Sequence, residues 1–308
     1  MKVKEILNLL GELTILLGVI VSLMMVGNLT LNHARANESV ASKIIEEITE
    51  IEELIEIETN GLKSRYALLV DLQNGRTILN QGGSETMYPA SMTKVMTALV
   101  AIEALDDLND LIQLNPEMFS ELHAQEAALA GFSPGEEVPA IDLLYGIMLP
   151  SGAESAIGLA EAVAGSEENF VQLMNMKASE LGMEGTNFTN SVGFHDANHY
   201  STAEDMVKLV QYALRNETFK ELFMAETHRA ANGILLESTL FSRIPTTIVE
   251  GGEIIGGKTG FTIPAGRCLV SLAEINGKQY ILVTAAAENT PENQIQHLLD
   301  ALYIYNQL

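Results

Sequence analysis

Two Asn-Gly pairs, one near each end of the folded part of the chain, place the strongest constraint on the fold. Asn74-Gly75 and Asn276-Gly277 each lie between two apolar, strand-like runs, which is the strongest short-range signal for a β-hairpin. The strand-like runs cover residues 66–71, 76–80, 254–262, 268–275 and 280–285. Because strands stand at both ends and helices between them, we predict one α+β domain, with an antiparallel sheet flanked by helices and completed by the C-terminal hairpin.

The middle of the chain is predicted to be mainly helical. The expected helices follow Ser91 and cover residues 141–148, 154–164, 169–181 and 203–215, and a closing helix covers about 292–305. Ser201 or Thr202 is expected to cap the helix 203–215, with Glu204 or Asp205 as the partner in a capping box.

The N-terminal stretch has the pattern of a membrane segment. Lys2 and Lys4 precede an uncharged run from Leu13 to Asn32, which matches the ~20 residues needed to cross a bilayer. Ala34-Arg-Ala36 has the small-x-small form of a signal-peptide cleavage site, so a retained anchor and a cleaved signal are both open. In either case the positive-inside rule places the rest of the chain outside the cytoplasm.

Three parts are therefore expected along the chain. Residues 1–36 form the transmembrane anchor or signal peptide, residues 37–60 an acidic helical linker, and residues 61–308 the folded domain. The formal net charge of -24 argues against nucleic acid as a partner, because the phosphate backbone requires a basic face. Cys268 is the single cysteine, so no internal disulfide can form, and its apolar neighbours predict an inert core thiol.

Ser91 and Lys94 are the first candidate catalytic residues. They stand three positions apart at the start of an apolar, helical run, so both side chains lie on one helical face. A serine becomes a good nucleophile when a neighbouring base takes its proton, and a lysine whose pKa is lowered by burial or by another cation is such a base.

Two further motifs follow in order. Ser151-Gly-Ala153 lies in a loop that enters a helix, and Lys258-Thr-Gly260 lies on a glycine-rich strand that a substrate backbone can approach closely. The order Ser-x-x-Lys, serine loop, Lys-Thr-Gly is the signature of penicillin-binding proteins and active-site serine β-lactamases. With the blocks Tyr88-Pro-Ala-Ser and Gly193-Phe-His-Asp, residues 61–308 resemble a serine-type D-alanyl-D-alanine carboxypeptidase, a low-molecular-mass penicillin-binding protein.

The resemblance implies a β-lactamase/transpeptidase-like domain and a role for each motif residue. Ser91 resembles the nucleophile that attacks a peptidoglycan stem peptide ending in D-Ala-D-Ala, Lys94 the general base, and Ser151 the group that returns a proton to the leaving D-alanine. The residues expected to bind substrate are Lys258, Thr259, Gly260, Phe261 and Arg267. No cofactor or metal is implied, and β-lactams are expected as covalent inhibitors.

The sequence departs from the family pattern at Ala153, where the second motif usually carries asparagine. Alanine cannot make the hydrogen bonds of that amide to the substrate and to the base lysine, and losing one such contact typically costs about 1–3 kcal/mol. Glu154 is adjacent and is a candidate to place a carboxylate near Lys94. Arg267 is assigned as the clamp for the substrate carboxylate because it is the one arginine after the Lys-Thr-Gly motif.

The sequence supports two alternative functions less well. A class A β-lactamase needs a Glu-x-x-Leu-Asn loop, which the sequence after Ser151 lacks. A degenerate domain that binds wall peptides or scaffolds envelope proteins is supported by Ala153 alone. His195 and His199 are interpreted as structural residues of a loop, not metal ligands, and Glu167 as a solvated charge at a helix start.

Overall fold

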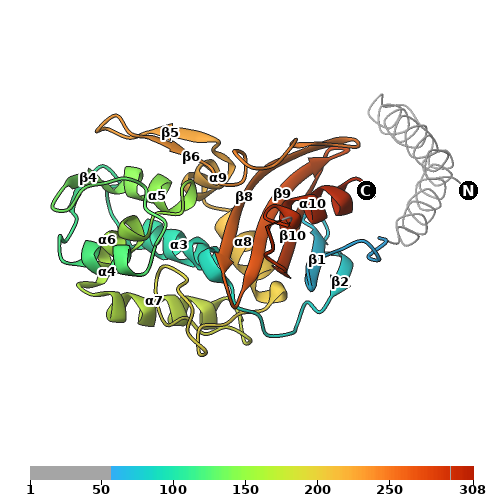
Figure 1. The fold of residues 1–308 in the computed structure, drawn as a ribbon, viewed down its shortest axis with the longest axis horizontal. Coiled ribbons are helices and arrows are strands. Elements are labelled where there is room, and N and C mark those ends of the chain that lie inside the picture. The colour runs from blue at the N-terminus through green and yellow to red at the C-terminus, as the bar shows by residue number, and fades with distance from the viewer. Residues whose placement is uncertain (1–56, 292) are drawn as a thin grey trace, which may run out of the picture. The chain divides into compact units, whose positions relative to one another are not determined.

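An antiparallel sheet of six strands, in the order β2-β1-β10-β9-β8-β7, carries the fold (Figure 1). The computed structural model describes residues 57–291 and 293–308, and Ile57–Leu308 form one compact unit. The strands are β1 (Tyr66–Asp71), β2 (Thr77–Gln81), β7 (Ile248–Val249), β8 (Gly252–Thr262), β9 (Gly266–Ile275) and β10 (Lys278–Ala287). Both predicted hairpins are confirmed, since β1 pairs with β2 and β9 with β10. The predicted mixture of helices and antiparallel sheet is therefore correct.

The helical part lies between β2 and β7 in the sequence, as predicted. It begins with the 3-10 turn η1 (Ala90–Thr93) and continues with α3 (Lys94–Ala104), α4 (Met118–Ala124), α5 (Ala140–Met148), α6 (Ala153–Ala164), α7 (Glu167–Glu180), α8 (Ala203–Ala213) and α9 (Glu217–Met224). The closing helix is α10 (Gln296–Tyr305). Helices α4 and α9 were not predicted.

Two small two-stranded sheets were also missed, and the second of them is a hairpin. They pair β3 (Leu111–Gln113) with β4 (Glu137–Pro139), and β5 (Thr227–Arg229) with β6 (Leu235–Glu237). A sequence signal for this hairpin existed, because Asn232-Gly233 joins β5 to β6.

Thr202 caps α8, because its side chain accepts a hydrogen bond from the backbone N–H of Asp205 at 3.0 Å. The predicted capping box is wrong, however. The buried Asp205 carboxylate instead accepts hydrogen bonds from Gly185 N and from the Thr186 hydroxyl, both at 2.8 Å, and so fastens another loop to the helix.

The two faces of the sheet are covered by different helices. Helix α10 packs on β9 and β10 on one face, where the Tyr305 hydroxyl lies 3.2 Å from the Ser271 hydroxyl (Figure 1). Because side chains alternate along a strand, Cys268 and Val270 of β9 face the opposite side and join the core around α3. As predicted, Cys268 is buried, and burial raises the pKa of its thiol to about 11.

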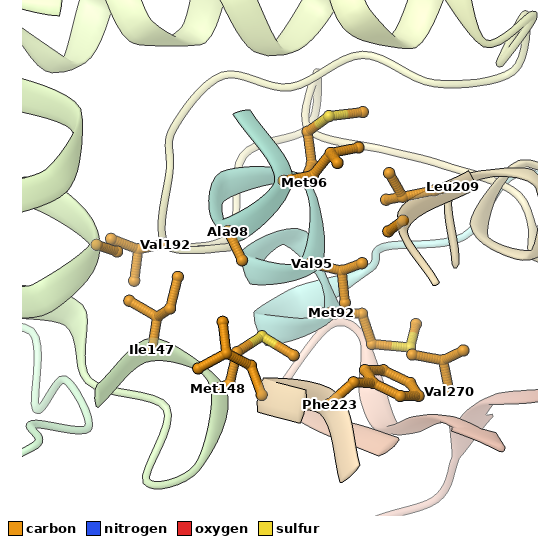
Figure 2. Close-up of a cluster of buried hydrophobic side chains, with 14 of the residues drawn as sticks. Met92, Val95, Met96, Ala98, Ile147, Met148, Val192, Leu209, Phe223 and Val270 are labelled. Atoms are coloured by element: carbon orange, nitrogen blue, oxygen red, sulfur yellow. The ribbon is translucent and has the colours of Figure 1, made fainter. Parts of the chain in front are cut away.

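Helix α3 is the centre of the hydrophobic core (Figure 2). Met92, Val95, Met96 and Ala98 of η1 and α3 are fully buried and are surrounded by side chains from other elements. The labelled partners are Ile147, Met148, Val192, Leu209, Phe223 and Val270. Each large apolar side chain buried in this way contributes about 1.5–3 kcal/mol. The segment that carries Ser91 therefore stands on a rigid support.

The predicted N-terminal segment (1–36) and most of the predicted linker lie outside the described residues. Within residues 57–291 and 293–308, no helix is both long and apolar enough to span a membrane.

Candidate active site

The turn before α3 brings Ser91 and Lys94 together. The Lys94 Nζ atom lies 3.2 Å from Ser91 Oγ and donates a hydrogen bond of 2.8 Å to the Val192 carbonyl. Ser91 stands in the 3-10 turn η1, one step earlier than the first α-helical turn that the sequence predicted. Ala90 before it has a φ of 47°, a left-handed conformation that is strained for a residue with a side chain and that often occurs at functional sites.

Lys94 is buried, and its surroundings favour the neutral amine. Burial lowers the pKa of Lys94 to about 7, while the negative charges of Glu154 and Glu167 oppose this shift. A lysine whose pKa is near neutral can accept the proton of Ser91 and give it back.

Ser151 and Lys258 form a second close pair. Lys258 Nζ donates to Ser151 Oγ and to the Thr259 carbonyl, both at 2.9 Å. Ser151 has a φ of 70°, so this loop holds a second strained residue. The loop is fixed by the backbone, because Gly152 N donates to Gly146 O and Ala153 N to Ala128 O, each at 2.8 Å.

Lys258 is also fully buried, but its charged neighbours differ from those of Lys94. Burial lowers the pKa of Lys258 well below its usual value, and the positive charges of Lys94 and Arg243 lower it further. Arg243 is exposed and precedes the Lys-Thr-Gly strand. Arg243 was not predicted, because the further cation was expected after the Lys-Thr-Gly motif and Arg243 precedes it.

Strand β8 approaches the nucleophile turn closely at Gly260. A Cβ atom at this position would lie 3.1 Å from both Ser91 N and Pro89 O, so glycine is what allows the two backbones to come together. Gly193 has a similar effect from the other side, since its Cβ would overlap the Ala90 carbonyl. Gly260 was predicted to let a substrate backbone approach the strand. The structure shows a close approach of β8 to the Ser91 turn, and the substrate contact stays a prediction.

Thr259 lies at the open edge of β8. Among the described residues β7 pairs with β8 only at Gly252 and Glu253, so the stretch that carries the motif has a free edge. The Thr259 hydroxyl lies 2.6 Å from the Thr239 hydroxyl, and Thr239 N donates to the Leu149 carbonyl. Thr239, which the sequence did not single out, therefore orients Thr259 toward the Ser151 loop.

The structure does not bring Arg267 to this group. Arg267 pairs with Phe261 across β8 and β9, on the face of the sheet opposite Lys258 and Cys268. Its guanidinium carbon lies 4.3 Å from the centre of the Phe261 ring, and its Nε donates to Asn289. The side chain of Arg267 is thus held by Phe261 and Asn289, and its assignment as the carboxylate clamp stays a prediction.

The loop before α8 has structural contacts at both histidines. The Thr189 N–H donates to His199 Nδ1, so Nε2 carries the proton and donates to Thr93 Oγ1 at 2.7 Å. Burial lowers the pKa of His199 to about 4, which keeps the ring neutral. The His195 ring meets the Tyr88 ring edge-on. No group of three or more potential ligands that could hold a metal occurs within the described ranges.

Glu167 departs from its interpretation as a solvated charge. Its carboxylate accepts hydrogen bonds from Ser191 N at 2.8 Å and from the Ser191 hydroxyl at 2.6 Å. Because Ser191 precedes Val192, whose carbonyl accepts from Lys94, Glu167 fixes the loop against which the amine rests.

Comparison with known proteins agrees with this arrangement. The sequence model of a family described as D-alanyl-D-alanine carboxypeptidase, peptidase S11, matches residues 54–289. The chain belongs to this family. The matched range includes all three motifs and the Gly193 loop.

Relatives of known name are about 30% identical. The chain is 31% identical over 250 residues to D-alanyl-D-alanine carboxypeptidase DacF of Bacillus subtilis (strain 168), which covers 77% of this chain and 61% of the relative. It is 30% identical over 253 residues to the carboxypeptidase DacC of Escherichia coli (strain K12), covering 75% and 58%. The chain therefore spans about three fifths of these two relatives.

The fold is shared with a solved enzyme of similar size. The structure of the Streptomyces K15 DD-transpeptidase has a TM-score of 0.71 and 26% sequence identity, covering 82% of this chain and 98% of that one. The common fold extends over almost the whole of that protein.

Proposed function

We propose that this S11 member is a serine-type D-alanyl-D-alanine carboxypeptidase. The observation that carries the proposal is the pairing of Ser91 with a buried Lys94 at 3.2 Å, and of Ser151 with a buried Lys258 at 2.9 Å. The substrate is a peptidoglycan stem peptide that ends in D-Ala-D-Ala.

Acylation begins with a neutral Lys94. Its Nζ takes the proton of Ser91 Oγ while this oxygen attacks the carbonyl carbon of the penultimate D-alanine. The backbone N–H groups of Ser91 and Phe261 receive the negative charge that develops on the carbonyl oxygen, and each such donor is typically worth about 3 kcal/mol of the barrier.

The leaving D-alanine needs a proton on its nitrogen. Ser151 Oγ–H supplies it and receives in its place the proton that Lys94 took from Ser91, so Lys94 is neutral again. Lys258 Nζ, which donates to Ser151 Oγ, holds this hydroxyl in position. The C–N bond breaks, an ester forms on Ser91, and D-alanine departs with its amine. Water then attacks the ester, with Lys94 again removing a proton, and the shortened peptide is released.

The terminal carboxylate of the substrate is recognised by Lys258 and Thr259. Lys258 lies near the basic side chains of Lys94 and Arg243, so an incoming carboxylate meets basic groups in an otherwise acidic protein. β-Lactams carry a comparable carboxylate and acylate Ser91 in the same way, which makes them covalent inhibitors.

The proposed location is the extracytoplasmic face of the bacterial cytoplasmic membrane. Lys2, Lys4 and the uncharged run from Leu13 to Asn32 support a membrane anchor, and Ala34-Arg-Ala36 supports secretion to the cell wall after cleavage. Fractionation of producing cells tests this, because cytosolic protein of full length would contradict both forms.

The activity is tested by incubating the full chain with diacetyl-Lys-D-Ala-D-Ala and measuring free D-alanine. Release by the wild type and none by Ser91→Ala is expected, and it would show that Ala153 is tolerated. A covalent penicillin adduct without release of D-alanine would point to another acyl donor, and rapid turnover of penicillin to a β-lactamase. If no adduct forms and no D-alanine is released, the result would favour a binding module.

A further inference from the structure

Glu154 is the most deeply buried carboxylate beside the site. It follows Ala153 at the start of α6 and is fully buried. Its Oε1 accepts hydrogen bonds from Ala130 N at 2.6 Å and from Gly131 N at 2.9 Å. Its Oε2 has no hydrogen-bond partner among the described residues. A buried carboxylate that is half satisfied is costly, so its presence requires a reason.

The hydrogen bonds that Glu154 accepts connect residues 128–131 to the loop that carries Ser151. The segment 128–131 touches this loop twice, through Ala128 O, which accepts from Ala153 N, and through the two N–H groups held by Glu154. Gly152 lies inside this arrangement, because a Cβ there would come within 2.8 Å of Ala130 N and 3.0 Å of Glu154 Oε2. Glu154 thus helps to hold the left-handed conformation of Ser151.

Glu154 also faces Lys94 electrostatically. The groups that surround the Lys94 amine are Ser91, the Val192 carbonyl, the Lys258 amine, and the carboxylates Glu154 and Glu167. Glu154 is the larger of the two carboxylate influences on the pKa of Lys94, and it is the more deeply buried. Burial also raises the pKa of Glu154, while hydrogen bonds from Gly131 and Ala130 oppose that shift.

We propose that Glu154 is a positioning residue of this active site: it fastens residues 128–131 to the Ser151 loop and supplies a negative charge that acts on Lys94. This rests on the proposed function. Ala153 has only a methyl group and can provide neither the hydrogen bonds nor the charge, so the neighbouring carboxylate completes this side of the site.

The test separates the two contributions with full-length variants and a fluorescent penicillin. Glu154→Gln keeps an oxygen that can accept from Ala130 N but loses the charge, so Lys94 is neutral at lower pH. We expect the acid limb of the acylation rate to move down by about one pH unit. Glu154→Asp keeps the charge but is one methylene shorter, so an unmoved acid limb with slower acylation is expected.

Matched controls come from α7. Glu167→Gln is expected to move the acid limb less than Glu154→Gln, and the exposed Glu168→Gln not at all. An unmoved acid limb in Glu154→Gln would overturn the proposal. If that variant does not fold, a displaced acid limb in Glu154→Asp would overturn the charge role. Failure of the proposed function is distinct, because the wild type would then not acylate at any pH.

Discussion

The two lysines of the site are both fully buried, yet they lie in opposite surroundings. Lys94, between η1 and α3, has two carboxylates near it, Glu154 and Glu167, and its pKa is about 7. Lys258, on β8, has cations near it, and the positive charges of Lys94 and Arg243 add to the effect of burial on its pKa. The charged neighbours of Lys94 are therefore carboxylates, and those of Lys258 are basic side chains.

Because their surroundings differ, the two amines are suited to different roles. Lys94 can change its protonation state near neutral pH at little cost, as a general base must. Lys258 has no ion pair with a carboxylate in the described part of the chain, so a substrate carboxylate would be its first negative partner. Binding that carboxylate raises the pKa of Lys258 and favours its charged form.

The largest expected effect is that of Lys94→Met. Without the amine, Ser91 has no base, and a general base typically contributes about 10²–10⁴-fold. We expect acylation by penicillin to slow by about 10³-fold, measured by stopped-flow or gel fluorescence. The matched control is Lys63→Met, at an exposed lysine, which should acylate like the wild type. Equal loss in both variants would refute a specific role for Lys94.

Lys258→Met tests the other half of the comparison. A hydrogen bond to a charged group is worth about 1.5–3 kcal/mol, so kcat/KM for a peptide with a free C-terminal carboxylate should fall by roughly 10- to 150-fold. The loss of the hydrogen bond from Lys258 to Ser151 would add to this decrease. A peptide with an amidated C-terminus should lose less. The same loss on both peptides would show that Lys258 does not read the carboxylate.

The free energy of unfolding should fall in acid because of two buried histidines, one near Lys94 and one in α10. His199 forms a hydrogen bond with Thr93 beside Lys94, and burial lowers its pKa from the usual 6.5 to about 4. The unfolded chain therefore binds the proton first, and stability is lost as the pH falls from about 6.5 to 4, by roughly 3 kcal/mol. Thermal unfolding of His199→Gln should show a smaller loss over this range.

His297 provides the counterpart on the sheet side. It lies in α10, and burial lowers its pKa to about 3. Its contribution to the free energy of unfolding is lost over a pH range that extends down to about 3. In His297→Gln, thermal stability should therefore depend less on pH down to about pH 3. Identical curves for the wild type and both variants would contradict the account of buried, neutral histidines.

The smallest effect is expected for Gly152→Ala. The new Cβ would lie 2.7 Å from Ala130 Cβ and 2.8 Å from Ala130 N, so the segment held by Glu154 must shift. Overpacking of this kind typically costs about 1–3 kcal/mol, to be measured by urea unfolding, and acylation should slow as Ser151 moves. In Gly61→Ala the nearest atom would be 3.7 Å away, which predicts wild-type behaviour. Unchanged stability and acylation in both would show that the loop is not tightly held.

Much of the fold could be predicted because its signals are local. Each Asn-Gly hairpin is encoded by a few neighbouring residues, and Ser91 and Lys94 are brought together by helical spacing alone. The short hairpin β5–β6 was missed although Asn232-Gly233 carries the same signal, because its strands are only three residues long.

The parts of the site that were missed depend on contacts between distant segments. Glu167 was interpreted as solvated because helix-start carboxylates usually are, and its bond to Ser191 comes from the return of the chain 24 residues later. The direction of the Glu154 side chain depends on where residues 128–131 lie. For Arg267, the contacts with Phe261 and Asn289 likewise depend on how distant parts of the sheet are paired.

The most direct test of the account is to locate the covalent adduct. The full chain is incubated with benzylpenicillin, digested, and analysed by mass spectrometry beside Ser91→Ala and Lys94→Met. We predict one penicilloyl group, on the peptide that contains Ser91, absent in Ser91→Ala and formed slowly in Lys94→Met. No adduct, or an adduct that persists in Ser91→Ala, would contradict the account.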